Sequence, residues 1–190
     1  WKIEETENFF LQTVPLQNAI THPHKRMQHL AGRYLLRYLF PDFPYELIRI
    51  ADTLIPFLQN EAYHFSISHC GDYAAAIVSG DKRTGLDIEI FSDKIRRVKD
   101  KFINSIEAGI IERFQQPATS ELMKLTLMWS CKEAMFKWYG QGQLDFRKHM
   151  QLQAIYADEG KHCTFADFLF TKEKAKLLKV QTVFLEKFAM

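Results

Sequence analysis

The hydrophobic period of the chain changes several times, and this limits the folds that the chain can adopt. Apolar residues recur every three or four positions in residues 27–39, which is typical of one face of a helix. In residues 63–79 the apolar residues alternate or form a short run, with turn-forming residues at 70–72. The stretch 42–62 shows neither period and reads as irregular. We therefore expect an N-terminal helical segment followed by a β-hairpin.

The second half of the chain returns to helical periodicity and then to alternation. A helical stripe covers residues 94–114, and another helix is expected to begin after Thr119 or Ser120 and to end at Gly140. Four further segments have the character of strands: residues 84–90, 151–156, 162–169 and 178–185. Helices and strands in this order, without a strict βαβ alternation, predict the α+β fold class.

This order also suggests two halves, each with its own strands and a long helix. We expect their boundary near residues 80–84. Residues 1–80 and 81–190 would be the two halves of one integrated unit. The chain has 25 Lys and Arg against 23 Asp and Glu and a net charge of +2, which gives no reason to expect a nucleic-acid or membrane partner. No apolar run approaches the ~20 residues of a membrane span, and no signal peptide is apparent, so the cytoplasm is the expected location.

Two carboxylates lie on one face of the segment 85–89, whose sequence is GLDIE. In a strand, Asp87 and Glu89 point the same way, with their Cα atoms about 7 Å apart. Two carboxylates at that spacing can converge on one hard cation such as Mg²⁺. The alternative is the solvent face of an edge strand, where acidic side chains commonly sit.

The segment 129–137, with the sequence WSCKEAMFK, places three chemically distinct side chains on one helical face. Trp129, Glu133 and Lys137 are spaced four residues apart, so the acid can reach a metal ion while the base reaches phosphate oxygens. The alternative is a surface pair between Glu133 and Lys137, with Trp129 in the core. Cys131 is interpreted as a small helical filler, because no histidine lies at a recognisable spacing from it.

Two more segments carry groups that suit phosphate. Ser66 and Ser68 share one face of the predicted hairpin, and Ser68 with His69 at the strand end can donate to phosphate oxygens. A basic helix start supplies further cations: Lys25, Arg26 and Arg33. The alternatives are a structural histidine in the first segment and a solvated basic face in the second.

Taken together and in this order, the segments 66–69, 85–89 and 129–137 resemble the 4′-phosphopantetheinyl transferases. Residues 24–37 look like the N-terminal helix of the longer, Sfp-like class of this superfamily, and the resemblance spans about residues 20–145. It implies a pseudo-dimeric fold in which two similar α+β halves are related by a pseudo-twofold axis. The active site would lie between them, in a protein expected to be a monomer.

The resemblance also implies an activity and a set of residue roles. The 4′-phosphopantetheine group of coenzyme A would pass to a serine of an apo acyl or peptidyl carrier protein, releasing adenosine 3′,5′-bisphosphate. The implied ligands of Mg²⁺, or alternatively Mn²⁺, are Asp87, Glu89 and Glu133. The implied or candidate coenzyme A contacts are Lys25, Arg26, Arg33, Ser68, His69, Lys132 and Lys137. Glu133 would act as the base, Lys137 would add a fixed positive charge, and Trp129 would shape the wall of the cleft.

One position departs from the family pattern, in which a Lys-Pro or Arg-Pro pair precedes the SxSH strand. Ile55 precedes Pro56 here, so a cation is missing, and Lys25 or Arg26 would have to compensate. The basic segment 94–101 is expected either to steer an acidic carrier protein or simply to be solvated.

Two other classes of function remain open from the residues alone. One is another Mg²⁺-dependent enzyme that hydrolyses a phosphate ester or a pyrophosphate with the same three carboxylates. The other is a non-catalytic nucleic-acid-binding module that uses residues 22–37 and 94–101. The second class would leave the placement of the carboxylates unexplained, and the near-neutral net charge argues against it.

Overall fold

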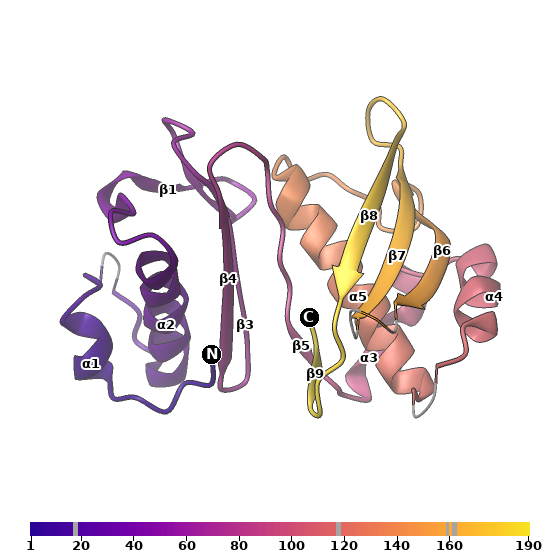
Figure 1. Ribbon diagram of the computed structural model, residues 1–190, viewed down its shortest axis with the longest axis horizontal. Helices are drawn as coiled ribbons and strands as arrows, with labels where there is room; N and C mark the ends of the chain where they lie inside the picture. Colours follow the sequence, from indigo (N-terminus) through magenta and orange to yellow (C-terminus); the bar gives the residue numbers. More distant parts are fainter. Residues whose placement is uncertain (17–18, 117–118, 159, 161–162) are drawn as a thin grey trace. The chain divides into compact units, whose positions relative to one another are not determined.

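The computed structural model describes residues 1–16, 19–116, 119–158, 160 and 163–190. Its helices and strands confirm the predicted α+β class (Figure 1). The chain divides into two compact units, each described by itself. Unit 1 comprises Trp1–Ile88 and Lys137–Gln141, and unit 2 comprises Glu89–Phe136 and Gly142–Met190. Among the described helices, none combines the length and the apolar character that a membrane span needs.

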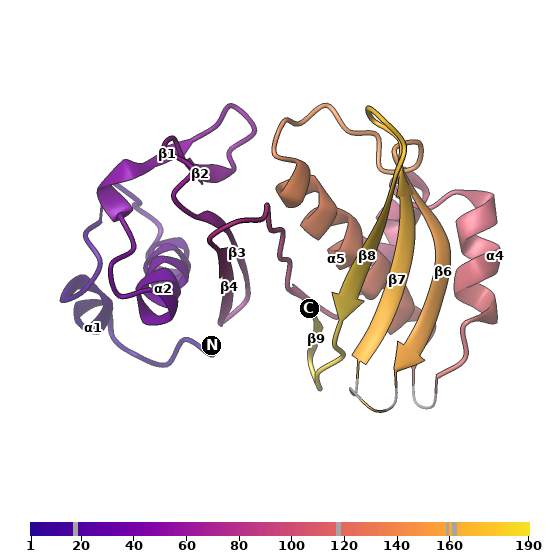
Figure 2. The same ribbon diagram turned by 45° about the horizontal axis from the view of Figure 1, so that its top comes forward.

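Unit 1 is built from one long helix against a β-hairpin. Its elements are α1 (Glu7–Leu11), α2 (Pro23–Leu39), a 3₁₀ turn (Tyr45–Leu47), β1 (Ile48–Ile50), β2 (Pro56–Leu58), β3 (His64–Cys70) and β4 (Tyr73–Ser79). Helix α2 packs against β4 and β3, as both views show (Figures 1 and 2). Leu30 and Leu36 of α2 and Phe65 and Ala74 of the hairpin are buried in its core.

The predicted helix and hairpin of unit 1 are confirmed, and a second, smaller hairpin was missed. Strands β3 and β4 pair in antiparallel register from His64↔Ser79 to Cys70↔Tyr73. Gly71 adopts a φ of 54° in the turn between them, a conformation that glycine reaches without steric strain. The region predicted to be irregular contains the small antiparallel hairpin β1–β2. Its three-residue strands are too short to show an alternating pattern, and Pro56 opens one of them.

Unit 2 is built from a three-stranded antiparallel sheet and two main helices. Its elements are β5 (Glu89–Ile90), α3 (Lys94–Val98), a 3₁₀ turn (Lys99–Lys101), α4 (Ser105–Arg113), α5 (Glu121–Tyr139), β6 (Met150–Asp158), β7 (Cys163–Phe170), β8 (Lys176–Thr182) and β9 (Phe188–Ala189). The sheet order is β6-β7-β8, and α4 packs against β6. Helix α5 runs behind the sheet in Figures 1 and 2, although its last three residues belong to unit 1.

The long helix predicted over residues 94–114 is in fact two helices. The first part ends at Val98, and Asn104 caps the start of the second, where its side chain accepts hydrogen bonds from the N–H groups of Ile106 and Glu107. The Glu107 carboxylate accepts in return from the Asn104 N–H, which completes a capping box and starts α4. The start of α5 agrees with its predicted cap, since Ser120 Oγ accepts from the Met123 N–H at 3.2 Å. Gly140 follows its end, with a φ of 76°.

The three late strands are confirmed, with residue 162 of the second outside the described residues. The strand predicted over residues 84–90 is wrong for most of its length, because only Glu89–Ile90 forms one, against β9. Side chains satisfy the preceding backbone instead: Ser66 Oγ accepts from the Leu86 N–H at 3.1 Å, and Ser68 Oγ from the Ile88 N–H at 3.3 Å.

The same serine contacts explain why the boundary between the units differs from the prediction. The chain was expected to divide near residues 80–84, but the division falls after Ile88. Two seryl hydroxyls on β3 hold residues 86–88 beside the hairpin, so these residues belong to unit 1. Whether the two units repeat one fold stays a prediction.

Gly32 of α2 lies against the side chain of Ile67 of β3. A Cβ at this position would lie 2.5 Å from Ile67 Cγ2, a methyl group on a stiff β-branched side chain. We expect Gly32→Ala to lower the free energy of unfolding by about 1–3 kcal/mol, despite the higher helix propensity of alanine. Urea denaturation measures this change.

Gly109→Ala in α4 is the matched control, because its added Cβ meets only Arg113 Nη1, at 3.5 Å. That variant should be more stable than the parent by up to ~1 kcal/mol. Equal destabilisation by both substitutions would contradict the close packing of α2 on β3.

Candidate functional site

Unit 1 holds a buried carboxylate paired with a lysine. Asp87 is 5% exposed, and its Oδ1 accepts hydrogen bonds from Ser68 Oγ at 2.9 Å and from Lys137 Nζ at 2.8 Å. Lys137 Nζ also donates to the Leu86 carbonyl at 3.1 Å. Asp87 Oδ2 is buried and has no hydrogen-bond partner among the described residues. The network therefore satisfies one oxygen of Asp87 and leaves the other available for a ligand.

A free carboxylate oxygen is the type of ligand that Mg²⁺ prefers, so Asp87 fits the predicted metal role. The two other predicted ligands, Glu89 and Glu133, belong to unit 2. There, Glu89 Oε1 accepts a hydrogen bond from Trp129 Nε1 at 3.2 Å. Within the described part of the chain, no three His, Cys, Asp or Glu side chains are grouped as a complete metal site. The three-carboxylate set stays a prediction.

Unit 1 contains a cavity of about 340 Å³, which we call the cationic cavity. Its polar lining comes from His29, Arg33, Ser66, His69 and Lys137, and its apolar lining from Ile20, Ile50, Leu54, Ile55, Pro56 and Ile67. The cavity therefore combines positive charge with an apolar wall, a combination that suits a ligand with an anionic group and an apolar body.

Two buried donors of the cationic cavity lack partners within the described residues: His29 Nε2 and Arg33 Nε. Arg33 Nη1 lies 3.0 Å from His29 Nδ1, so the neutral histidine carries its proton on Nε2. Burial, together with the neighbouring Arg33 charge, lowers the pKa of His29 to about 4. Buried donors without partners are energetically unfavourable, and a bound phosphate would satisfy both.

His69 also borders the cationic cavity. Partial burial lowers its pKa, and the nearby Lys137 charge acts in the same direction. The fixed positive charges of this cavity are therefore Arg33 and Lys137, while the two histidines serve as neutral hydrogen-bonding groups near neutral pH.

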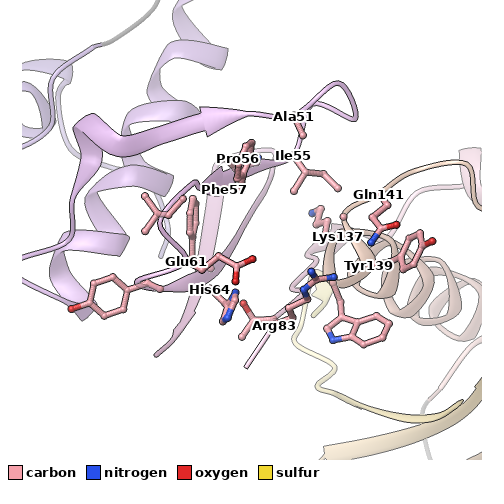
Figure 3. Close-up of a pocket in the computed structure, with 16 residues that line it drawn as sticks. Ala51, Ile55, Pro56, Phe57, Glu61, His64, Arg83, Lys137, Tyr139 and Gln141 are labelled. Carbon is pink, nitrogen blue, oxygen red and sulfur yellow. The ribbon is translucent and has the colours of Figure 1, made fainter. Parts of the chain in front are cut away.

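A second cavity of about 200 Å³ shares Ile55, Pro56 and Lys137 with the first. We call it the aromatic cavity, because its lining includes Phe57, Tyr63, Phe65, Trp138 and Tyr139. Figure 3 shows Ile55 and Pro56 on one side of it and Glu61, His64 and Arg83 on the other. Lys137 is thus at a wall common to both cavities.

Three of the predicted coenzyme A contacts, Arg33, His69 and Lys137, are brought together by the fold. Sequence reasoning missed His29, although it lies one helical turn before Arg33 and so on the same face of α2. It also missed the apolar wall, because that wall comes from the β1–β2 hairpin.

Lys132 requires a correction. It is fully buried in unit 2, where its Nζ donates to the carbonyls of Phe102 at 2.6 Å and Phe146 at 2.9 Å and to Glu107 Oε1 at 2.6 Å. A lysine ammonium group has three hydrogens, and all three are used. Unlike Lys137, Lys132 is fully buried and lines neither cavity, so it is a structural residue of unit 2. The structure does not support the prediction that it contacts phosphate.

The remaining predicted contacts lie elsewhere in unit 1. Arg26 makes a two-pronged ion pair with Glu7, with both N–O distances at 2.8 Å, and donates to the Ile20 carbonyl. This pairing removes Arg26 as a ready substitute for the cation missing at Ile55. Lys25 is exposed on the first turn of α2, and Ser68 is buried in the Asp87 network.

Trp129 is held in unit 2 by aromatic packing. Its ring lies edge-on to Phe102 with a centroid distance of 5.1 Å and is tilted against Phe146 at 5.7 Å. Because its Nε1–H donates to Glu89, this packing also orients the Glu89 carboxylate. Trp129 thus positions a predicted metal ligand.

Comparisons with known proteins agree with the family resemblance. A family model of the 4′-phosphopantetheinyl transferase superfamily matches residues 83–187. Enterobactin synthase component D of Escherichia coli (strain K12) is 36% identical over 116 residues, which cover 60% of this chain and 54% of that protein. The 4′-phosphopantetheinyl transferase psf-1 of Bacillus pumilus is 31% identical over 84 residues, or 44% of this chain and 35% of that protein. The chain spans about half the length of the curated enterobactin synthase relatives it matches.

The lowered pKa of His29 predicts a loss of stability in acid. The unfolded chain binds a proton at His29 near the ordinary histidine pKa of 6.5, whereas the folded protein does so only near pH 4. The contribution of neutral His29 to the free energy of unfolding is therefore fully present above pH 6.5. It is lost as the pH falls from 6.5 towards 4, by at most ~1.4 kcal/mol per pH unit. Urea denaturation gives the free energy of unfolding at pH 5 and at pH 7. The difference between the two values should be smaller for His29→Gln than for the parent.

Proposed function

The chain belongs to the 4′-phosphopantetheinyl transferase superfamily, and we propose that it transfers the 4′-phosphopantetheine group of coenzyme A to a serine of an apo acyl or peptidyl carrier protein. We assign it to the long, Sfp-like class, a proposal supported by its division into two compact units. The observation that carries the proposal is the position of Lys137, which pairs with Asp87 and lines the cationic cavity. The monomeric state and cytoplasmic location expected from the sequence are part of this proposal.

In this proposal the 3′-phosphate of coenzyme A occupies the cationic cavity. Arg33 supplies the charge, and Arg33 Nε and His29 Nε2 supply donors that lack partners among the described residues. These two residues take over the role of the cation that the family carries at the position of Ile55. The adenine ring would lie in the adjoining aromatic cavity, where aromatic side chains offer stacking surfaces.

The pyrophosphate would then lie beside Lys137, at the wall that the two cavities share. Asp87, Glu89 and Glu133 would hold Mg²⁺, or Mn²⁺ in its place, since both ions suit oxygen ligands. Such an ion, when bound, neutralises charge on the pyrophosphate and on the leaving group.

The chemical step is a displacement at phosphorus. The carrier serine Oγ forms a bond to the β-phosphorus, and the bond from that phosphorus to the bridging oxygen breaks. Glu133 accepts the proton of the serine hydroxyl, and Lys137 stabilises the negative charge that develops on the departing adenosine 3′,5′-bisphosphate. No covalent enzyme intermediate is needed.

Intact-mass spectrometry of an apo acyl carrier protein, incubated with the protein, coenzyme A and Mg²⁺, tests this function. We expect the addition of one phosphopantetheinyl group, which chelation of the metal abolishes. Asp87→Asn should lower the rate by at least about 100-fold, because second-shell changes around metals alone lower activity by 10–100-fold. Circular dichroism checks that the variant is folded.

Asp81→Asn is the matched control, because Asp81 is an exposed aspartate of the same unit and should react like the parent. Hydrolysis of coenzyme A without a carrier protein would favour the hydrolase class instead. A protein that binds coenzyme A but modifies none of several carrier proteins would contradict the proposed acceptor.

The proposed docking site for an acidic carrier protein is the basic segment 94–101. Arg96 is already paired there with Asp93 and Glu121. Four other exposed cations complete the segment: Lys94, Arg97, Lys99 and Lys101. Exposed charges at the rim of an interface act mainly by steering the encounter, and their effect falls as salt is added.

The double reversal Lys94→Glu and Arg97→Glu should raise KM for the carrier protein several-fold, while KM for coenzyme A stays unchanged. The effect should shrink in high salt, because screening weakens the steering. Lys174→Glu, at another exposed lysine of unit 2, is the control and should change neither constant. An unchanged KM for the carrier protein in the double variant would remove this docking proposal.

A further inference from the structure

The Ser68 hydroxyl group is fully used within unit 1. It donates to Asp87 Oδ1 at 2.9 Å and accepts from Lys137 Nζ at 2.9 Å and from the Ile88 N–H at 3.3 Å. A seryl hydroxyl has one hydrogen and two lone pairs, so its capacity is exhausted. Ser68 is also only 5% exposed. It can contact a phosphate only by giving up one of these bonds.

These bonds also decide which atom of Asp87 is left over. Oδ1 receives both the Ser68 hydroxyl and the Lys137 ammonium group, whereas Oδ2 has no partner among the described residues. Lys137 in turn uses its three hydrogens on Ser68 Oγ, the Leu86 carbonyl and Asp87 Oδ1. Ser68 thus contacts both groups that the proposed reaction needs.

We propose that Ser68 is a positioning residue, which holds the Asp87 carboxylate so that Oδ2 is left for a metal ligand and holds Lys137 against Oδ1. This inference rests on the proposed function, and it replaces the direct phosphate contact that the family resemblance implies for Ser68. Hydrogen bonds that orient a carboxylate ligand in this way typically raise metal affinity by about 10–100-fold.

Ser66 provides a built-in comparison on the same face of β3. Its hydroxyl accepts from the Leu86 N–H at 3.1 Å and lies 3.5 Å from the Leu86 carbonyl. It therefore anchors the same backbone segment as Ser68, but these contacts involve neither Asp87 nor Lys137. A merely structural role for Ser68 predicts similar behaviour of the two serines, whereas a positioning role predicts different behaviour.

The test compares Ser68→Ala, Ser68→Thr and Ser66→Ala by two binding measurements: Mn²⁺ affinity by electron paramagnetic resonance with coenzyme A present, and coenzyme A affinity by calorimetry without metal. Ser68→Ala should weaken Mn²⁺ binding about 10–100-fold and leave metal-free coenzyme A affinity within about twofold of the parent. Ser68→Thr keeps the hydroxyl and should recover most of the Mn²⁺ affinity. Ser66 also lines the cationic cavity, so the Mn²⁺ affinities are compared at saturating coenzyme A. Under that condition Ser66→Ala should change Mn²⁺ affinity by less than about threefold.

A loss of metal-free coenzyme A affinity in Ser68→Ala, as large as the loss of Mn²⁺ affinity, would overturn the proposal in favour of a direct phosphate contact. Equal Mn²⁺ losses in Ser66→Ala and Ser68→Ala would overturn it in favour of a structural role. A third measurement needs no ligand: the urea midpoints of Ser68→Ala, Asp87→Asn and the double variant. The urea midpoint of the double variant should be no lower than that of the less stable single variant.

Additive midpoint shifts would show that Ser68 does not hold Asp87, whatever the protein catalyses. If the parent neither binds coenzyme A nor modifies a carrier protein, the proposed function fails. The midpoints still decide in that case whether Ser68 orients Asp87.

Discussion

The ion pair between Asp87 and Lys137, closed by the Ser68 hydroxyl, is the interaction around which the candidate site is built. It joins residues that lie 19 and 50 positions apart, from the hairpin, the segment after it and the end of α5. A buried ion pair is tolerated only when further hydrogen bonds offset the desolvation of both charges. Here Ser68 and the Leu86 carbonyl supply those bonds. The end of α5 therefore groups with unit 1, apart from the rest of its helix.

Three of the five buried side-chain atoms that lack partners among the described residues match two kinds of ligand. In the cationic cavity they are donors, His29 Nε2 and Arg33 Nε, which suit an anion. In the Asp87 network the atom is an acceptor, Oδ2, which suits a cation. Buried polar groups in native proteins are nearly always satisfied, so such atoms mark places where a ligand completes the structure. A phosphate-rich substrate used together with a divalent ion has both of these requirements, and this agreement supports the proposed reaction.

The nine residues 129–137 show that one motif can serve two purposes. Lys132 is buried with Glu107 and holds unit 2 together, since Glu107 also accepts from the N–H groups of Asn104 and Leu152. Lys137, five residues later, belongs to unit 1 and lines both cavities. The sequence alone does not distinguish the roles of the two lysines. Burial lowers the pKa of Lys132, while the Glu107 carboxylate and two carbonyl oxygens offset the desolvation of its ammonium group. Its hydrogens are therefore used within unit 2 and not for ligand binding.

Local pattern by itself determined the α+β class, helix α2, the β3–β4 hairpin, the ends of α5 and the late strands, because periodicity and caps act over a few neighbouring residues. Motif order pointed to the superfamily and to Arg33, His69 and Lys137. Only the tertiary structure decided how the predicted groups use their hydrogen bonds. Ser68, Arg26, Lys132 and Lys137 spend theirs on partners distant in sequence, while His29 gains a place in the cavity. The physical reason is that hydrogen-bond capacity is small and is shared among residues that folding brings together, which spacing along the chain does not reveal.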